Sequence, residues 1–116
     1  MTANRHSAWL AAAALAWAVL AWSAPPAAAQ DCRKTHDIDI TYEFTPKELH
    51  IQVGDCVRWT NVHTIEHSAA GLKWEFNTGQ LMPGGRSLIT FDKAGEIPYW
   101  CAHHPPMQAK LVVEAN

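Results

Sequence analysis

The residues best suited to chemistry lie together near the carboxyl end of the chain, in the segment Cys101-Ala-His103-His104-Pro-Pro-Met107. This segment places one thiol, two imidazoles and one thioether within seven residues. A thiolate and two imidazoles in a trigonal plane, with a thioether sulfur at a longer axial distance, form the ligand set of copper electron-transfer sites. The segment therefore predicts a copper site built from Cys101, one of the two histidines and Met107.

A second imidazole has to come from a distant part of the chain. His67 is the best-placed candidate, because it follows the strand expected around Trp59 and lies within residues 61–80, a long segment of weak periodicity. A loop of this length in a small β domain usually carries function. His63, four residues earlier, is the alternative upstream ligand.

The segments that must position these ligands alternate polar and apolar residues with a period of two, as half-buried strands do. Strands are expected over residues 37–44, 48–53, 56–60, 87–91, 97–101 and 110–114. The first of them directs four side chains toward one buried face, namely Ile38, Ile40, Tyr42 and Phe44. Turn signals such as Gly54-Asp55 and Pro83-Gly84-Gly85 separate the strands. We therefore expect an all-β sandwich or a small barrel.

The first 30 residues differ from the rest in composition. They carry one Arg near the start, an unbroken apolar run of 15 residues from Ala8 to Trp22, and the small residues Ala27–Ala29. This order is typical of a secretory signal peptide. At about 1.5 Å per residue the run is too short for the ~30 Å hydrocarbon core of a bilayer. We expect residues 1–29 to be a cleaved signal peptide and residues 30–116 to form the working domain in an oxidising compartment.

Size and charge exclude several function classes for the 86 residues that follow residue 30. They hold eight Lys and Arg against eleven Asp and Glu, without a basic run, which argues against nucleic acid as a partner. A chain of this length forms one domain and leaves no room for a second catalytic domain.

Taken together, these segments resemble the cupredoxins, and most closely the amicyanin and pseudoazurin branch of small bacterial blue copper proteins. The resemblance covers about residues 42–114. Its motifs are Tyr42-Glu-Phe44-Thr-Pro46, Leu49-x-Ile51-x-Val53-Gly54-Asp55-x-Val57-x-Trp59-x-Asn61, His67, Phe91-Asp92-x-x-Gly95 and Tyr99-x-Cys101-x-x-His104-x-x-Met107. It implies a plastocyanin-like (cupredoxin) domain, a Greek-key β-sandwich of about seven to eight strands.

The resemblance also implies a ligand set. It suggests that one Cu(I)/Cu(II) ion per chain is held by His67, Cys101, His104 and Met107. His104 is preferred to His103 because its spacing from Cys101 is similar to that in the short ligand loop of amicyanin. The family usually has Asn directly after the upstream histidine, where this chain has Ser68.

The function implied by the resemblance is a periplasmic shuttle of single electrons rather than an enzyme. Its partners would be redox proteins that bind transiently, such as a periplasmic dehydrogenase or a c-type cytochrome. They would dock on an apolar patch to which Met82, Pro83, Pro105 and Pro106 could contribute. We expect a monomer that binds neither nucleic acid nor, once the leader is removed, a membrane. The alternative is a copper chaperone or storage module that uses the additional histidines His36, His63 and His103.

Two cysteines remain once Cys101 is assigned to the metal. Cys32 and Cys56 are an even number in a chain expected to be exported, which predicts a disulfide between them. Free thiols, or a second soft-metal site that includes His36, are the alternatives. His36, His50 and His103 are otherwise expected to be solvated surface side chains.

Overall fold

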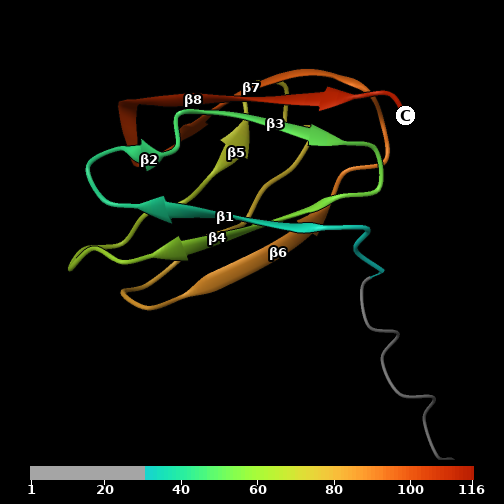
Figure 1. Ribbon diagram of the computed structural model, residues 1–116. Coiled ribbons are helices and arrows are strands. Elements are labelled where there is room, and N and C mark those ends of the chain that lie inside the picture. Colours follow the sequence, from blue (N-terminus) through green and yellow to red (C-terminus); the bar gives the residue numbers. More distant parts are fainter. Residues whose placement is uncertain (1–30) are drawn as a thin grey trace, which may run out of the picture.

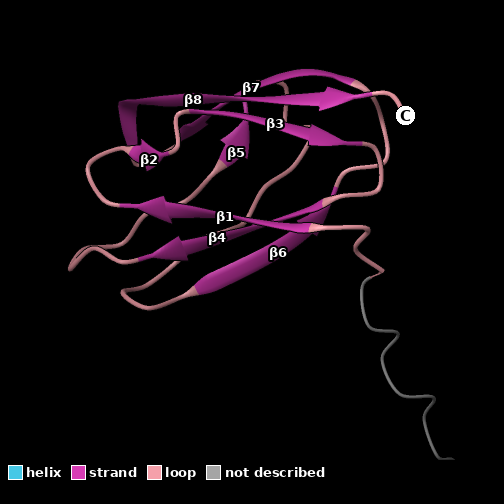
Figure 2. Ribbon diagram, in the orientation of Figure 1, coloured by secondary structure: helices cyan, strands magenta, loops and turns pink. Residues whose placement is uncertain are grey.

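The computed structural model describes residues 31–116, which form two four-stranded sheets that lie face to face (Figure 1). The predicted signal peptide, residues 1–29, lies outside the described residues. All regular elements from residue 31 onward are strands (Figure 2). They are β1 Thr35–Ile40, β2 Phe44–Thr45, β3 Glu48–Gln52, β4 Cys56–Asn61, β5 Ala70–Gly71, β6 Arg86–Thr90, β7 Gly95–Cys101 and β8 His104–Glu114. Residues 31–116 contain no helix that is long and apolar enough to cross a membrane.

The order of the strands shows how the chain passes between the two sheets. One sheet has the order β2-β1-β4-β6 and the other the order β3-β8-β7-β5. Strand β1 runs parallel to β4, and β3 runs parallel to β8, so the chain crosses from sheet to sheet instead of forming successive hairpins. This arrangement confirms the predicted all-β sandwich.

The first strand ends earlier than its alternating pattern predicts. Strand β1 stops at Ile40, a tight turn follows in which the Thr41 amide donates to the Glu43 carbonyl at 3.0 Å, and Phe44 returns antiparallel to Ile40. Tyr42 lies in this turn and is 77% exposed. The prediction that Tyr42 lies on the buried face is therefore wrong. The alternation of polar and apolar residues continues in the sequence beyond Ile40, but the backbone turns there and the strand ends.

The last strand is longer than predicted and begins at His104 instead of residue 110. Its second half pairs on one side with β3 and on the other with β7, whereas its first half pairs with β7 alone. Pro105 and Pro106 lie in the irregularity of the β7–β8 ladder, between the pairs Cys101–His104 and Trp100–Gln108, where they have no partner on β7, so their missing N–H groups are compatible with the strand. The strand can therefore extend to the residue paired with Cys101.

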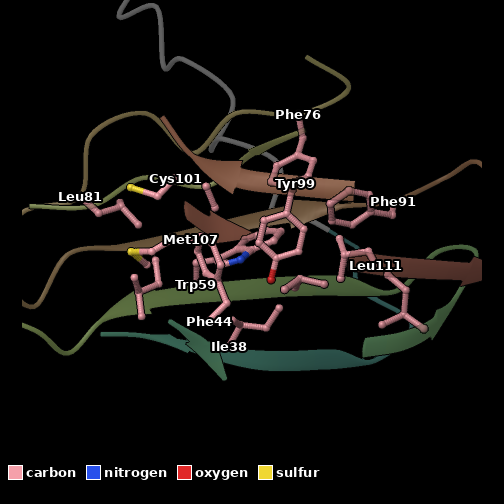
Figure 3. Close-up of a cluster of buried hydrophobic side chains, with 14 of the residues drawn as sticks. Ile38, Phe44, Trp59, Phe76, Leu81, Phe91, Tyr99, Cys101, Met107 and Leu111 are labelled. Carbon is pink, nitrogen blue, oxygen red and sulfur yellow. The ribbon is translucent and has the colours of Figure 1, made fainter. Parts of the chain in front are cut away.

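Aromatic side chains fill the space between the sheets (Figure 3). The ring of Trp59 stacks on Phe76 at a centroid distance of 4.9 Å and meets Tyr99 and Phe91 edge-on at 5.8 and 6.1 Å. Such pairs add roughly 0.5–1.5 kcal/mol each to the stability that burial alone provides. The cluster also contains Cys101 and Met107, so two of the predicted copper ligands are part of the core.

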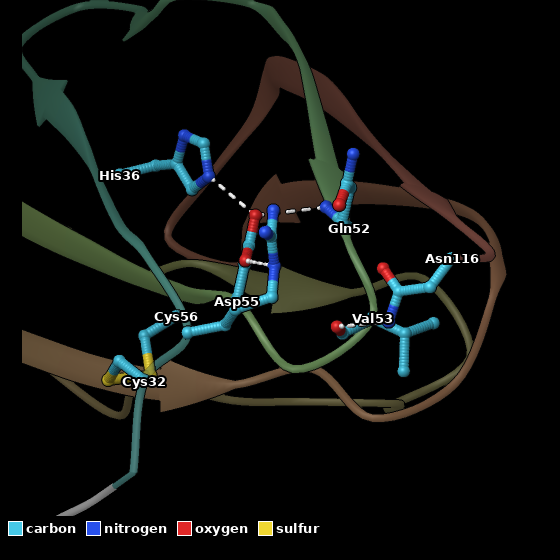
Figure 4. A network of polar contacts seen from close by, with 8 residues as sticks. Cys32, His36, Gln52, Val53, Asp55, Cys56 and Asn116 are labelled. Carbon is cyan, nitrogen blue, oxygen red and sulfur yellow. Dashed lines mark hydrogen bonds and ion pairs between the residues drawn. A yellow bond between two sulfur atoms is a disulfide. The ribbon is translucent and has the colours of Figure 1, made fainter.

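Cys32 and Cys56 form a disulfide, which confirms the predicted pairing (Figure 4). The bond joins the segment that precedes β1 to the first residue of β4, across 24 positions of the sequence. Closing a loop of this length stabilises a fold by about 3–4 kcal/mol in the chain-entropy model. The soft-metal alternative for these two thiols is therefore wrong.

Asp55 anchors the same end of the molecule (Figure 4). Its carboxylate is 1% exposed and accepts hydrogen bonds from Arg33 Nε at 2.9 Å and from the Gln52 amide at 3.0 Å, and it lies 2.8 Å from His36 Nε2. Burial alone would raise the pKa of Asp55, but the bonds from Gln52, His36 and Arg33 outweigh it and hold the pKa below its usual value. His36 is thus half-buried and paired, and the prediction that it is a solvated surface residue is wrong.

The buried Asp55 carboxylate should make the stability depend on pH. A folded-state pKa below the unfolded value of about 3.9 means that its contribution is present above that pH and is lost as the pH falls through the folded pKa. We expect Asp55→Asn to lower the free energy of unfolding by about 2–3 kcal/mol at neutral pH and to weaken its decline below about pH 4. Urea unfolding across this pH range measures both effects. The exposed Asp39→Asn is the matched control, and equal stability of Asp55→Asn and the unaltered chain would contradict the prediction.

Candidate metal centre

Three side chains converge at the end of the sandwich opposite the disulfide. The metal-binding atoms of His67, Cys101 and His104 all lie within 4.8 Å of one another. Cys101 Sγ is 3.8 Å from His67 Nδ1 and 3.6 Å from His104 Nδ1. No other group of three His, Cys, Asp or Glu side chains with this spacing occurs within residues 31–116.

The strand register places two of the three. Cys101 ends β7, His104 begins β8, and the two residues are paired across the antiparallel ladder. An irregularity in the ladder between Trp100 and Cys101 lets the connection close within two residues. The two donor atoms thus face each other because of the hairpin itself.

His67 reaches the site from the long segment that follows β4. A two-residue bridge holds it, in which the His67 amide donates to the Leu81 carbonyl at 3.0 Å and the Leu81 amide donates to the His67 carbonyl at 2.7 Å. Both His67 and Cys101 are completely buried, and His104 is partly exposed. The site is therefore closed toward the core and open to solvent only beside His104.

Met107 lies on β8 and belongs to the same buried cluster as Cys101. Figure 3 shows the sulfur atoms of Met107 and Cys101 at the same end of the core, beside Leu81. The fourth predicted ligand thus lies at the same end of the core as the Cys101 sulfur. His103, the alternative to His104, is exposed and lies outside this group.

Ser68 occupies the position where the resemblance led us to expect Asn. Its amide points to Cys101 Sγ at 3.4 Å, its hydroxyl oxygen lies 3.9 Å from the same sulfur, and that oxygen accepts a hydrogen bond from the Ala102 amide at 3.3 Å. Donors directed at a thiolate stabilise its negative charge and tune the metal that it binds. Ser68 therefore joins the two ligand segments, as a bracing residue must.

The environment of His67 favours a neutral imidazole. Burial, with smaller effects from His104, His63 and His103, lowers the pKa of His67 below its usual value. A histidine has to be neutral to coordinate a metal. The low pKa and the buried position thus suit a ligand.

Two residues at the site have roles that the sequence interpretation did not assign to them. Asn61 is fully buried; its Nδ2 donates to the carbonyls of Ile65 and Leu81, both at 2.8 Å, and its Oδ1 accepts the His63 amide at 3.0 Å. His63 lies behind His67, with its Nδ1 2.9 Å from His67 Nε2 and thus on the side away from Cys101. The sequence signals for Asn61 were its place at the end of an apolar strand and in the motif Trp59-x-Asn61 that carries the resemblance.

The donor set suits copper. One soft thiolate, two imidazole nitrogens and a thioether match the combination that selects copper in electron-transfer sites, whereas magnesium and calcium require oxygen ligands. His67, Cys101, His104 and Met107 could hold such an ion.

Comparisons with known proteins agree with this chemistry. Residues 11–113 match the family model described as a cupredoxin-like domain. Amicyanin from Paracoccus denitrificans is 35% identical over 96 residues, which cover 78% of this chain and 73% of the relative. Amicyanin-alpha from Methylorubrum extorquens is 30% identical over 77 residues, covering 62% of this chain and 65% of that relative.

Solved structures show the same fold. A purple cupredoxin from Nitrosopumilus maritimus superposes with a TM-score of 0.63 at 26% identity, covering 67% of this chain and 98% of that one. A reduced amicyanin variant has a TM-score of 0.60 at 33% identity over 67% of this chain and 80% of its own. A copper-containing nitrite reductase from Thermus scotoductus has a TM-score of 0.64 at 30% identity, but the match covers only 22% of that larger chain and 67% of this one.

The hydrogen bonds of Asn61 predict that this side chain stabilises the ligand segment. Asn61→Ala removes the Nδ2 donor from the Ile65 and Leu81 carbonyls and the Oδ1 acceptor from the His63 amide, so we expect it to lower the free energy of unfolding by about 2–3 kcal/mol in a urea titration. Asn77→Ala is the control, because the exposed Asn77 also accepts a backbone amide, from Gly79 at 2.7 Å. A loss no larger for Asn61→Ala than for Asn77→Ala would refute the role of Asn61.

Proposed function

We propose, since this chain belongs to the cupredoxin family and to its amicyanin-like branch, that it binds one copper ion and carries single electrons between redox proteins. The ligands proposed are His67, Cys101, His104 and Met107. The observation that carries the proposal is the convergence of two imidazole nitrogens and one thiol sulfur within 4.8 Å at the end of a rigid core.

Bound copper would supply a one-electron couple, Cu(I)/Cu(II), in a ligand set intermediate between the preferences of the two oxidation states. The chain keeps that set fixed. Cys101 and His104 are held by the β7–β8 ladder, and His67 is held by its bridge to Leu81. The locked φ angles of Pro105 and Pro106 stiffen the connection from His104 to Met107. Ligands that move little between oxidation states favour fast electron transfer.

The surface beside His104 suits transient docking. Met82 is 58% exposed, and Pro83, Pro105 and Pro106 are also exposed. Met82 follows Leu81, the residue bridged to His67, so this apolar surface lies next to the ligands. A redox protein that covers it would approach the partly exposed His104. We propose a dehydrogenase or a c-type cytochrome as the partner, and a monomeric chain as the carrier.

An exported, periplasmic location is part of the proposal. The basic start, apolar run and small residues within positions 1–29 support a cleaved signal peptide. The Cys32–Cys56 disulfide supports an oxidising compartment, because such bonds are rare in the cytosol.

A carrier fits the site better than an enzyme or a copper chaperone. Four protein ligands would leave no coordination position for a substrate. Two of the three histidines that a chaperone could use are already paired within the protein, His36 with Asp55 and His63 with His67.

The ligand assignment predicts a colour change. Addition of Cu(II) should produce intense visible absorption from the bond between thiolate and copper at one ion per chain, and Cys101→Ser should abolish it. His104→Ala should weaken or remove the band, whereas the neighbouring His103→Ala should leave it unchanged. Absorption titrations measure all four proteins. A colourless complex of the unaltered chain, or loss of colour in His103→Ala alone, would refute the assignment.

The assignment of Met107 as the thioether ligand predicts that its replacement changes the reduction potential. Met107→Leu removes a donor that stabilises Cu(II) more than Cu(I), so the potential should rise while the colour persists. We expect a rise of about 59 mV or more, which is a tenfold change in the one-electron equilibrium. Voltammetry of the copper protein provides the measurement, with Met82→Leu as a control for an exposed methionine. An unchanged potential in Met107→Leu would show that Met107 is only a core residue.

A further inference from the structure

We propose that His63 is a positioning residue for His67, whose Nδ1 atom accepts a hydrogen bond from the His67 Nε2–H and keeps the His67 ring turned toward Cys101. The inference rests on the proposed function, because it takes His67 as a metal ligand. It assigns a role to a histidine that would otherwise compete with His67 for the metal.

The geometry places the two nitrogens of His67 in different surroundings. His67 Nδ1 lies 3.8 Å from Cys101 Sγ, and His67 Nε2 lies 2.9 Å from His63 Nδ1. The two imidazole rings are nearly parallel, at an interplanar angle of 23° and a centroid distance of 5.2 Å. His67 therefore has one nitrogen facing the other ligands and one facing His63.

The chemistry of imidazole decides the direction of this hydrogen bond. A neutral imidazole carries its proton on one nitrogen only. When Nδ1 of His67 offers its lone pair to a metal, the proton resides on Nε2, so His67 donates and His63 Nδ1 accepts. His63 then carries its own proton on Nε2.

His63 is itself held in place. Its amide donates to Asn61 Oδ1 at 3.0 Å, and the Tyr42 ring meets the His63 ring edge-on at a centroid distance of 4.2 Å. Asn61 is fixed in turn by its bonds to the carbonyls of Ile65 and Leu81. The acceptor thus has a defined position before any metal binds, and the exposed Tyr42 covers it.

Loss of the acceptor should be costly because His67 is fully buried. Among the described residues, His63 is the only hydrogen-bond partner of His67 Nε2. Without it the buried N–H would lack a partner, or the ring would rotate and carry Nδ1 away from Cys101. Removal of the partner of a metal-binding histidine typically weakens metal affinity by about 10–100-fold.

Two substitutions separate the hydrogen bond from the packing of the ring. His63→Phe keeps a ring beside His67 and Tyr42 but has no acceptor. His63→Asn lacks the ring, but its Oδ1 is bonded to Cγ as Nδ1 is in histidine, so an acceptor remains in place. We expect copper affinity to fall by about 10–100-fold in His63→Phe and to stay close to that of the unaltered chain in His63→Asn. His50→Phe is the control, because His50 is exposed and its Nδ1 bonds to Glu114 at 2.9 Å.

Nuclear magnetic resonance of the diamagnetic Cu(I) protein gives a direct readout. In the unaltered chain, the His67 Nε2–H should exchange slowly with solvent and show a nitrogen–nitrogen coupling to His63 Nδ1 across the hydrogen bond. Exchange should be about tenfold faster or more in His63→Phe and remain slow in His63→Asn, because an unpaired donor opens to solvent more often. The coupling is measured without any substitution, so it tests the inference even if a variant folds poorly.

Three outcomes would overturn the inference: no coupling in the unaltered chain, equal affinities of His63→Phe and the unaltered chain, or equal losses in the two variants. Failure of the unaltered chain to bind copper would instead overturn the proposed function. The two failures are therefore distinguishable.

Discussion

Antiparallel pairing of β7 with β8 brings Cys101 opposite His104 and places a thiol sulfur 3.6 Å from an imidazole nitrogen. The other features of the site depend on this ladder. It places Met107 in the core at the same end as Cys101, and β7 pairs along its other edge with the short strand β5. The segment between β4 and β6 can then fold over the end of the sandwich and bring His67 to the thiol. A ladder of backbone hydrogen bonds is stiff. The donor atoms of Cys101 and His104 should therefore move little when the proposed copper ion changes its oxidation state.

Closing the site from solvent adds a second requirement, because a buried polar group that lacks a hydrogen-bond partner lowers the stability of the fold. Asn61 donates to two backbone carbonyls and accepts the amide of His63, and Ser68 joins Cys101 to the segment that carries His67. The candidate ligands His67 and Cys101 thus lie within a network of hydrogen bonds that holds both of their segments in place. Hydrogen bonds in a buried network are stronger because the dielectric constant around them is low. The irregular segment between β4 and β6 can therefore hold His67 as firmly as a strand would.

The two ends of the sandwich are stabilised by different means. The disulfide and the Asp55 carboxylate fix the segment before β1 at one end, and the group of thiol, imidazoles and thioether lies at the other. A domain of this size buries a limited apolar area, so covalent and polar links add much to its stability. In the proposed function, this division leaves the end that carries the candidate ligands free to present an apolar surface to redox partners.

Local patterns in the sequence predicted the all-β class, the buried faces of residues 48–53 and 56–60 and the chemical types of the candidate ligands, and they favoured a disulfide over free thiols or a second metal site. These follow from local alternation, cysteine number and the spacing Cys101-x-x-His104-x-x-Met107, which are properties of short stretches of chain. Only the tertiary structure decided that Tyr42 is exposed, that His36 binds Asp55 and that β8 begins at His104. It also decided that His63 lies behind His67, on the side away from the thiol. There are two physical reasons. The alternation of polar and apolar residues does not reveal where a strand bends. The side of a histidine ring that faces a hydrogen-bond partner depends on contacts between segments that lie apart in the chain.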